Sequence, residues 1–292
     1  MQLNRRDFLA TSLAMSGASA FAANANSFAD PLFIMDTWFW FAEPKPAWKD
    51  RLAFLKSQGV NAICFSLGMG DERWDEFLEV ADLTESMGVE LVTVYVGINI
   101  DDEGVSPLMQ KVIDRLKGRK TKLHVPITSK TYKQSDPAGD SKALSALHHA
   151  AEKSFAADLP ISLYPHVNYW GERASDMARL AKQFNDPRLR ITFNLYHWLK
   201  VEGPDNLEAA IETVLPYLDC VTINGSFNNA KEIEVRAGIL PLGEGDYDVL
   251  SFVTAFKQAG YSGPLGIQGY GIDGDVVPKL ADTIAVWKAW NL

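Results

Sequence analysis

The chain has 292 residues, of which 47% are hydrophobic and 22% are charged, and its formal net charge is -9. This length and hydrophobic content suffice for a large core in a single domain. The acidic balance argues against nucleic acid as a partner, because phosphates are bound by clustered Lys and Arg. It also offers no basic patch to anionic lipid. We therefore expect a small-molecule ligand that is neutral or modestly charged.

Residues 1–26 are expected to form an export signal that is removed from the mature protein. Arg5 and Arg6 precede a Phe-Leu pair, and the mildly apolar stretch 10–22 ends in small residues that suit cleavage. This pattern resembles a bacterial twin-arginine signal, which implies transport by the twin-arginine translocase and a periplasmic domain over 27–292. The alternative is that these residues are a frayed amphipathic segment at the start of the chain. The apolar stretch is too short to stay as a stable membrane anchor.

After this segment, strand-like and helix-like segments alternate eight times. Apolar runs rich in β-branched residues predict strands, and apolar residues three or four positions apart predict helices. The predicted strands cover 32–37, 61–66, 90–96, 122–127, 161–164, 191–195, 220–224 and 265–268. The predicted helices cover 47–58, 71–87, 106–117, 141–157, 172–184, 207–217, 247–259 and 277–290. Longer polar connections occupy 128–140 and 225–245.

Eight strand–helix pairs joined by mostly short turns imply parallel strands with right-handed crossovers. The fold class is therefore α/β, and the expected architecture is a single (β/α)8 TIM barrel with its active site at the carboxyl ends of the strands. An open, doubly wound sheet is the alternative, but the Gly-rich phosphate turn that it would need is not found. Cys64 and Cys220 lie in core strands that a barrel would not place side by side, so we expect buried, free thiols.

Two motifs carry a resemblance to a known family. Asn194-Leu195-Tyr196-His197 resembles an Asp-x-x-His motif that follows the sixth strand of xylose isomerase-like TIM barrels. The segments 243–248 and 259–268 are similar to the closing Gly-x-Gly, Asp, helix, Gly-Tyr-x-Gly, strand and Glu pattern of the same proteins. The resemblance covers nearly all of 27–292 and implies the chemistry of a sugar isomerase or epimerase.

The resemblance also implies a divalent metal held by Glu, Asp, His and Glu at the ends of strands five to eight. The matching positions in this chain are Tyr164, Asn194, Asn224 and Gln268, which are all neutral. A divalent ion held by oxygen and imidazole needs anionic ligands, so we expect no metal cofactor here. The four side chains would instead bind sugar hydroxyls. A metal-dependent isomerase with rearranged ligands is an alternative.

Three histidines end or follow consecutive strands, and we expect them at the same barrel mouth: His124, His166 and His197. Imidazole titrates near neutral pH, so His166 or His197 could take a proton from carbon and return it. Lys200, shortly after the sixth strand, would stabilise a developing enolate oxygen, or it is a solvated loop cation. Three converging imidazoles could alternatively hold zinc or iron.

Aromatic residues are abundant around the same predicted rim. Trp40, Tyr95 and Tyr270 are candidates for stacking on sugar rings, because exposed aromatic side chains are costly unless they contact something. Glycines on both sides of Tyr270 predict a close approach of the backbone there. Asp36, at the end of the first strand, is the nearest carboxylate; it would bind substrate or cap the following turn.

These features predict a periplasmic enzyme of the sugar isomerase or epimerase type, which removes a proton next to the carbonyl of a sugar or keto-sugar derivative. Phosphorylated sugars are mainly cytoplasmic, so export disfavours them as substrates. The same carbanion chemistry permits β-elimination from a 3-keto-glycoside, which would make the enzyme a lyase. A non-catalytic sugar-binding relic of the fold is the alternative from another class. The sequence leaves the oligomeric state open.

Overall fold

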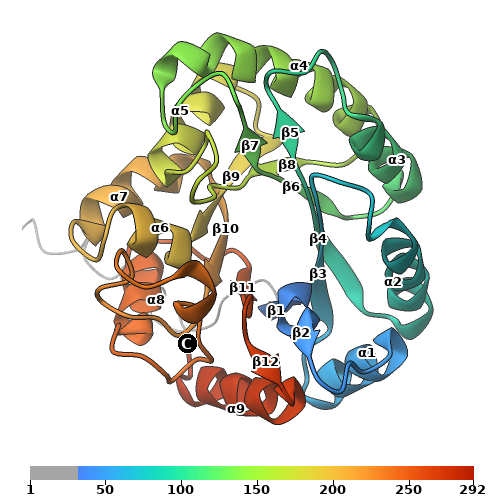
Figure 1. Cartoon of the computed structure of the whole chain (residues 1–292), viewed down its shortest axis with the longest axis vertical. Helices are drawn as coiled ribbons and strands as arrows, with labels where there is room; N and C mark the ends of the chain where they lie inside the picture. Colours follow the sequence, from blue (N-terminus) through green and yellow to red (C-terminus); the bar gives the residue numbers. More distant parts are fainter. Residues whose placement is uncertain (1–31) are drawn as a thin grey trace, which may run out of the picture.

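A computed structural model describes residues 32–292, so the expected export signal over 1–26 lies outside the described residues. In the described part of the chain, eight parallel strands close into a barrel (Figure 1). The strand β1 pairs with β3 on one side and with β11 on the other, which leaves no open edge. The prediction of a single (β/α)8 barrel is therefore confirmed, and the open sheet is excluded.

The barrel strands occupy the predicted positions. In chain order they are β1 (Leu32–Met35), β3 (Ala62–Gly68), β4 (Glu90–Val96), β6 (Lys122–Val125), β8 (Ile161–Leu163), β9 (Leu189–Asn194), β10 (Leu218–Ile223) and β11 (Leu265–Ile267). Two pairs of very short strands lie outside the barrel: β2 (Phe41–Ala42) with β12 (Asp273–Gly274), and β5 (Ile98–Asn99) with β7 (Ile127–Thr128).

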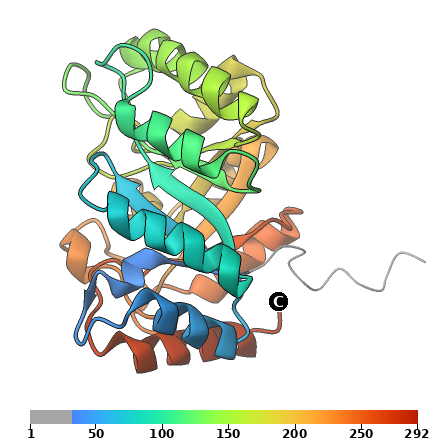
Figure 2. The same cartoon turned by 90° about the vertical axis from the view of Figure 1, so that its right-hand side faces the viewer.

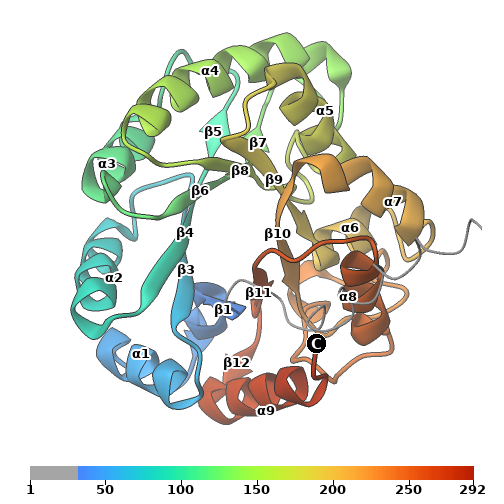
Figure 3. The same cartoon turned by 180° about the vertical axis from the view of Figure 1, so that it is seen from behind.

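Helices surround the barrel, as its two end views show (Figure 1 and Figure 3). They are α1 (Trp48–Ser57), α2 (Trp74–Met87), α3 (Pro107–Leu116), α4 (Asp140–Ala156), α5 (Ala174–Phe184), α6 (Leu195–Val201), α7 (Leu207–Val214), α8 (Val249–Gln258) and α9 (Val276–Ala289). In the side view, the helices from blue α1 to green α4 follow one another along the outer wall (Figure 2). Within residues 32–292, no helix has both the length and the apolar character that crossing a membrane requires.

Six strands end one or two residues earlier than the sequence predicts, and two of these differences shape the barrel mouth. The first strand is predicted over 32–37, but β1 ends at Met35 and a 3-10 turn follows at Asp36–Phe39. The sixth strand is predicted over 191–195, but β9 ends at Asn194 and the helix α6 begins at once. Apolar residues resume after Asp36-Thr37 and after Asn194, and an apolar segment alone does not distinguish a strand from the start of a helix.

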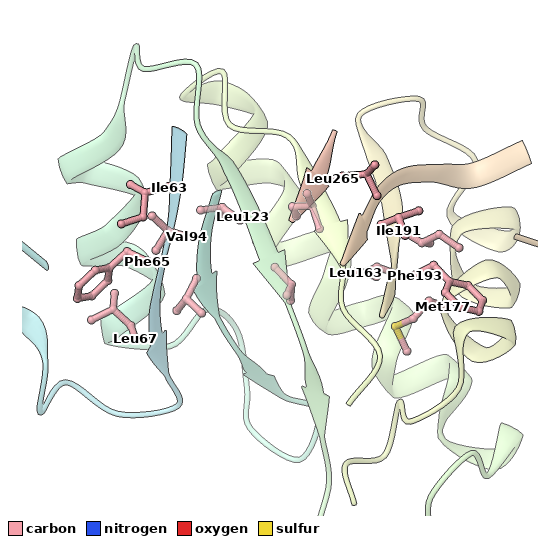
Figure 4. Packing of buried hydrophobic residues seen from close by; sticks show 14 of the residues in the cluster. Ile63, Phe65, Leu67, Val94, Leu123, Leu163, Met177, Ile191, Phe193 and Leu265 are labelled. Carbon is pink, nitrogen blue, oxygen red and sulfur yellow. The ribbon is translucent and has the colours of Figure 1, made fainter. Parts of the chain in front are cut away.

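Successive residues of a barrel strand face opposite sides of the wall, because strand side chains alternate. On β1, Phe33 belongs to a cluster of strand residues inside the barrel, whereas its neighbour Ile34 belongs to the larger core shared with the helices. Figure 4 shows part of this larger core, in which Phe193 of β9 lies beside Met177 of α5. Each such buried side chain contributes about 1.5–3 kcal/mol through the hydrophobic effect.

Both cysteines are free and buried, as the sequence predicts. Cys64 on β3 and Cys220 on β10 come from strands that are not neighbours, yet both belong to the interior cluster. Burial raises the pKa of Cys64 to about 12 and raises the pKa of Cys220 well above its usual value. Both thiols therefore stay protonated at neutral pH, which makes them poor nucleophiles.

Candidate active site

Asn194 links β9 to α6 and fixes the start of the helix. Its Oδ1 accepts the main-chain N–H of His197 at 2.8 Å, which is the N-cap bond of α6. Because Oδ1 is the acceptor in this bond, the Nδ2 amino group faces the other way, toward the barrel. An Asn before helix-compatible residues is the signal that could have predicted α6.

The Nδ2 group of Asn194 lies in a buried cluster of neutral side chains. It contacts Tyr164 Oη at 2.7 Å, Thr222 Oγ1 at 2.6 Å and Gln268 Oε1 at 2.7 Å. These three partners stand at or near the carboxyl ends of β8, β10 and β11. The structure thus brings three predicted site residues from separate strands into direct contact, and it adds Thr222 to them.

Asn224, the fourth position in this predicted set, makes a separate bond. Its Nδ2 donates to the main-chain oxygen of Gly225 at 2.7 Å. Its Oδ1 is buried and has no hydrogen-bond partner among residues 32–292. A buried acceptor without a partner costs about 1–3 kcal/mol. A ligand hydroxyl that donates to this oxygen would recover that cost.

His166 and His197 lie together. Their ring centroids are 4.2 Å apart and their planes are inclined by 42°. Tyr169 stacks on His166 with a centroid distance of 4.2 Å and an angle of 27°. His197 is buried, whereas His166 and Tyr169 are partly exposed. A ligand that enters from solvent would therefore meet His166 and Tyr169 before it meets His197.

Burial keeps both imidazoles neutral at pH 7. It lowers the pKa of His166 to about 4, although a hydrogen bond to the Val167 backbone acts in the opposite direction. It also lowers the pKa of His197 well below its usual value, and the nearby His166 adds to this effect. A neutral imidazole has one ring nitrogen with a lone pair and one that carries a proton. The two rings therefore offer hydrogen-bond acceptors and donors at the same place.

His124 does not join these two histidines, although the sequence predicts all three at one mouth. It pairs in register with Ser162, two residues before Tyr164 on β8, so it lies one layer deeper in the barrel. His124 is fully buried, its Nε2 is 3.3 Å from Thr192 Oγ1, and burial lowers its pKa to about 3. Across 32–292, no group of three or more His, Cys, Asp or Glu side chains is arranged to hold a metal ion. The three histidines thus do not converge on one point.

Asp36 follows β1 and pairs with Arg73, a residue that the sequence pattern does not indicate. Its Oδ2 accepts hydrogen bonds from Arg73 Nη1 at 2.6 Å and from Trp40 Nε1 at 3.0 Å. Arg73 also donates to Glu76 Oε2 at 2.8 Å and lies over the Trp40 ring at 5.0 Å. Asp36 is fully buried, and burial raises its pKa while Arg73 opposes this shift. Asp36 and Trp40 thus belong to an ion-pair network.

Tyr95 and Tyr270, the two tyrosines that the sequence selects for stacking on sugar rings, lie in different groups. Tyr95 meets Tyr164 edge-on with ring centroids 5.1 Å apart, so it borders the neutral cluster around Asn194. Tyr270 meets Trp40 edge-on at 5.7 Å, so it borders the ion-pair network. Of these two tyrosines, only Tyr270 is partly exposed.

The backbone approaches other segments closely on both sides of Tyr270, as the flanking glycines predict. A Cβ atom at Gly269 would lie 2.4 Å from the Trp38 ring. Gly271 has a φ of +92°, and a Cβ atom there would lie 2.4 Å from the main-chain oxygen of Arg236. Any larger residue at either position would displace the segment that carries Tyr270.

Lys200 lies on α6 and binds the connection between β10 and α8. Its ammonium group donates to the main-chain oxygens of Lys231 at 2.9 Å and Ile233 at 2.5 Å. Within residues 32–292, the hydrogen bonds of Lys200 therefore go to main-chain oxygens and not to the rings of His166 or His197.

The four positions that the resemblance assigns to a divalent metal do not suit a metal in this chain. Tyr164, Asn194, Asn224 and Gln268 are uncharged, and burial raises the pKa of Tyr164 further above neutrality. Asn194 presents N–H bonds to its neighbours, where a metal ligand would need a lone pair. A divalent ion held by oxygen and imidazole groups needs anionic ligands, and none of these four side chains is anionic. This set of donors is instead typical of a hydrogen-bonding site.

Comparison by sequence identifies one family. The family model described as "Xylose isomerase-like TIM barrel" matches residues 34–289. No curated protein matches the chain in sequence.

Several solved structures have the same fold. The 3-keto-D-glucoside 4-epimerase from E. coli is 15% identical with a TM-score of 0.67, over 89% of this chain and 99% of that chain. The probable 3-DHS dehydratase from Bacillus anthracis is 13% identical with a TM-score of 0.65, over 88% and 98%. A fusion protein of a xylose isomerase-like TIM barrel with 4-hydroxyphenylpyruvate dioxygenase is 15% identical with a TM-score of 0.67, and this chain spans 42% of its length. At such identities the likeness shows the fold alone.

Proposed function

The chain belongs to the xylose isomerase-like TIM barrel family, and from this premise we propose that it removes a proton next to the carbonyl of an uncharged sugar or keto-sugar derivative. The observation that carries the proposal is the contact between the neutral rings of His166 and His197, whose centroids are 4.2 Å apart. The epimerase and the dehydratase of the same fold support it as analogies. Fold alone would not define the reaction.

The paired imidazoles provide the groups that this chemistry requires. One ring nitrogen accepts the proton from carbon, the electron pair of the C–H bond forms a C=C bond, and the carbonyl oxygen becomes an enediolate oxygen. An N–H group of the second ring donates a hydrogen bond to this oxygen. Delivery of a proton from water to the opposite face of the same carbon, with loss of the abstracted proton to solvent, gives an epimer. Return of the proton to the former carbonyl carbon gives an isomer, in which the enediolate oxygen gains a proton and the neighbouring hydroxyl loses one to become the new carbonyl.

The charges around the site support an uncharged substrate. Arg73 is already paired with Asp36 and Glu76, at 2.6 Å and 2.8 Å. Lys200 donates to two main-chain oxygens. Neither cation is therefore placed to bind a phosphate group of a substrate. Oδ1 of Asn224, which has no partner in the described part of the chain, suits a sugar hydroxyl that can donate to it.

The reaction is proposed to proceed without a divalent metal, because the neutral cluster around Asn194 replaces the acidic ligands that the resemblance implies. Elemental analysis of protein purified without a chelator tests this directly. Less than about 0.1 metal ion per chain, together with activity that persists in EDTA, is the expected result. A stoichiometric metal with chelator-sensitive activity would instead establish a metal-dependent isomerase with rearranged ligands.

Solvent exchange tests the proposed reaction. The protein is incubated in deuterated water with a panel of aldoses, ketoses and 3-keto-glycosides, and the products are followed by NMR. Deuterium should appear next to the carbonyl, and His197→Ala should slow this by about 10²-fold or more while thermal unfolding changes little. The matched control is His149→Ala, because His149 is exposed on α4.

Other results would change the assignment. Tight binding of a sugar without any exchange would overturn proton abstraction and favour a non-catalytic sugar-binding protein. Release of the substituent two carbons from the carbonyl would identify a lyase, for which the dehydratase of the same fold is the relevant analogy. Full activity of His197→Ala would remove His197 from the mechanism.

The location in the cell is also part of the proposal. We propose that residues 1–26 direct twin-arginine export and that the barrel acts in the periplasm. Arg5, Arg6 and the following apolar stretch support this.

A further inference from the structure

The main chain of Val167 makes a hydrogen bond to each histidine of the site, as the acceptor in one bond and as the donor in the other. Its carbonyl oxygen is 2.8 Å from Nδ1 of His166, and its N–H donates to Nδ1 of His197 at 3.4 Å. A carbonyl oxygen can only accept a hydrogen bond, so Nδ1 of His166 carries the proton. A main-chain N–H can only donate, so Nδ1 of His197 carries the lone pair. One residue therefore selects different tautomers in the two rings.

The tautomers decide what the remaining ring nitrogens can do. Each neutral imidazole has a single N–H, so Nε2 of His166 has a lone pair and Nε2 of His197 has a proton. Nε2 of His197 is buried and has no hydrogen-bond partner in the described part of the chain. Within the same residues, the hydrogen bonds of the His166 ring involve only Nδ1. Two adjacent rings thus present one acceptor and one donor, and neither has a hydrogen-bond partner within residues 32–292.

The turn that carries Val167 is held by its own main-chain bonds. His166 N–H donates to the oxygen of Gly171 at 3.0 Å, and Tyr169 N–H donates to the oxygen of His166 at 3.0 Å. Val167 itself is 7% exposed. The N–H of Gly171 in turn donates to Ile127, just after β6. The peptide groups of Val167 therefore have fixed directions, and the two tautomers are fixed with them.

We infer that the two histidines have separate roles: Nε2 of His166 is the base that takes the proton from carbon, and Nε2–H of His197 is the donor that binds the carbonyl oxygen. This inference rests on the proposed function. The C–H bond breaks, an N–H bond forms on His166, and the electron pair ends on the substrate oxygen. His197 keeps its proton and stays neutral throughout. Val167 is a positioning residue that acts through its main chain.

The tautomers can be measured without any substrate. In protein labelled with ¹⁵N-histidine, long-range ¹H–¹⁵N correlations at neutral pH distinguish a ring protonated at Nδ1 from one protonated at Nε2. The five histidines are assigned with the variants His166→Gln and His197→Gln. Protonation of His166 at Nδ1 and of His197 at Nε2 is the expected result. The same tautomer in both rings would overturn the inference.

The same two variants test the roles. A Gln side chain can donate an N–H bond near the position of Nε2, but it cannot act as a base at neutral pH. We therefore expect His197→Gln to be at least about 10-fold more active in deuterium exchange than His197→Ala, since loss of such a donor costs about 10²–10³-fold. His166→Gln should be as inactive as His166→Ala. Rescue by Gln at position 166 but not at 197 would overturn the assignment.

Failure of the inference and failure of the proposed function give different results. If wild-type protein exchanges deuterium but both rings have one tautomer, only the separation of roles is overturned. If the tautomers differ as inferred but no substrate in the panel exchanges, the proposed function fails and the catalytic roles fail with it.

Discussion

Asn194 Oδ1 accepts the main-chain N–H of His197 at 2.8 Å, and this bond determines which way the Asn194 amide faces. An Asp at this position could cap α6 with one oxygen and bind a cation with the other. An Asn has only one oxygen, so its second group is a hydrogen-bond donor. An Asn in place of Asp therefore still caps α6, but its second side-chain group donates hydrogen bonds to neutral partners instead of binding a cation.

A double variant tests this reading of the neutral cluster. Asn194 and Gln268 are in contact at 2.7 Å, so Asn194→Asp combined with Gln268→Glu would bring two carboxylates together. We expect a lower Tm than wild type in EDTA, and a Tm that rises with Mn²⁺ concentration because the ion binds the folded state. Wild-type Tm should not respond to Mn²⁺. Calorimetric scans in both conditions measure the difference.

The matched control is Asn61→Asp with Gln258→Glu, because both of these side chains are exposed. It introduces the same two charges away from the barrel mouth and should show no stabilisation by Mn²⁺. An equal effect of Mn²⁺ on wild type, control and double variant would show that the ion acts elsewhere.

His124 makes stability depend on pH. A histidine in the unfolded chain titrates near pH 6.5, whereas burial lowers the pKa of His124 to about 3. Between these values the unfolded state binds more protons, so the free energy of unfolding falls as pH decreases, by about 1.4 kcal/mol per pH unit for this residue. His124→Gln should flatten this dependence, as measured by urea unfolding from neutral pH down to about pH 4.

The control for this prediction is His149→Gln, because His149 is exposed. The free energy of unfolding of this variant should change with pH as steeply as that of wild type. An unchanged slope in His124→Gln would show that His124 is not neutral in the folded protein over this range.

Lys200 should act on the connection between β10 and α8. Lys200→Met removes two hydrogen bonds to main-chain oxygens, which we expect to cost about 1–2 kcal/mol of local stability. Amide exchange within this connection should then become about 5–30-fold faster. The amide of Leu240, bonded to Gly225 at 2.8 Å, is a suitable probe.

Lys231→Met is the control, since it removes an exposed ammonium from the same connection and keeps the main-chain oxygen that Lys200 binds. Its exchange should resemble that of wild type. If Lys200→Met instead abolished turnover with unchanged amide exchange, Lys200 would act on the substrate oxygen.

Export should depend on the arginine pair. Replacing Arg5→Lys together with Arg6→Lys keeps the charge of the segment but removes the twin-arginine motif. We expect the variant to stay in the cytoplasmic fraction while wild type is recovered from the periplasmic fraction. Immunodetection after osmotic shock measures this. Periplasmic recovery of the variant in wild-type amounts would contradict twin-arginine export.

The meeting of polar side chains at one end of the barrel could be predicted from the sequence, because parallel barrel strands deliver their carboxyl ends to one face. That rule predicts that Tyr164, Asn194 and Gln268 lie together, as the structure shows. The same rule predicts His124 at this mouth, but His124 pairs with Ser162 inside β8 and so lies one layer deeper than Tyr164.

Other parts of the site depend on contacts that no local pattern encodes. Arg73 reaches Asp36 across 37 positions, through a connection whose path depends on packing. The Val167 peptide matters through its main chain, so its side-chain identity carries no signal at all. The roles of the histidines, the absence of a metal and the export of the chain stay predictions that the experiments above address.

The sulfur atoms of Cys64 and Cys220 lie inside a closed ring of strands, where they are shielded from solvent. A bulky alkylating reagent can reach them only after neighbouring strands separate. The rate at which the folded protein reacts with such a reagent therefore measures how often the barrel strands separate. The two cysteines report this opening at two non-adjacent strands.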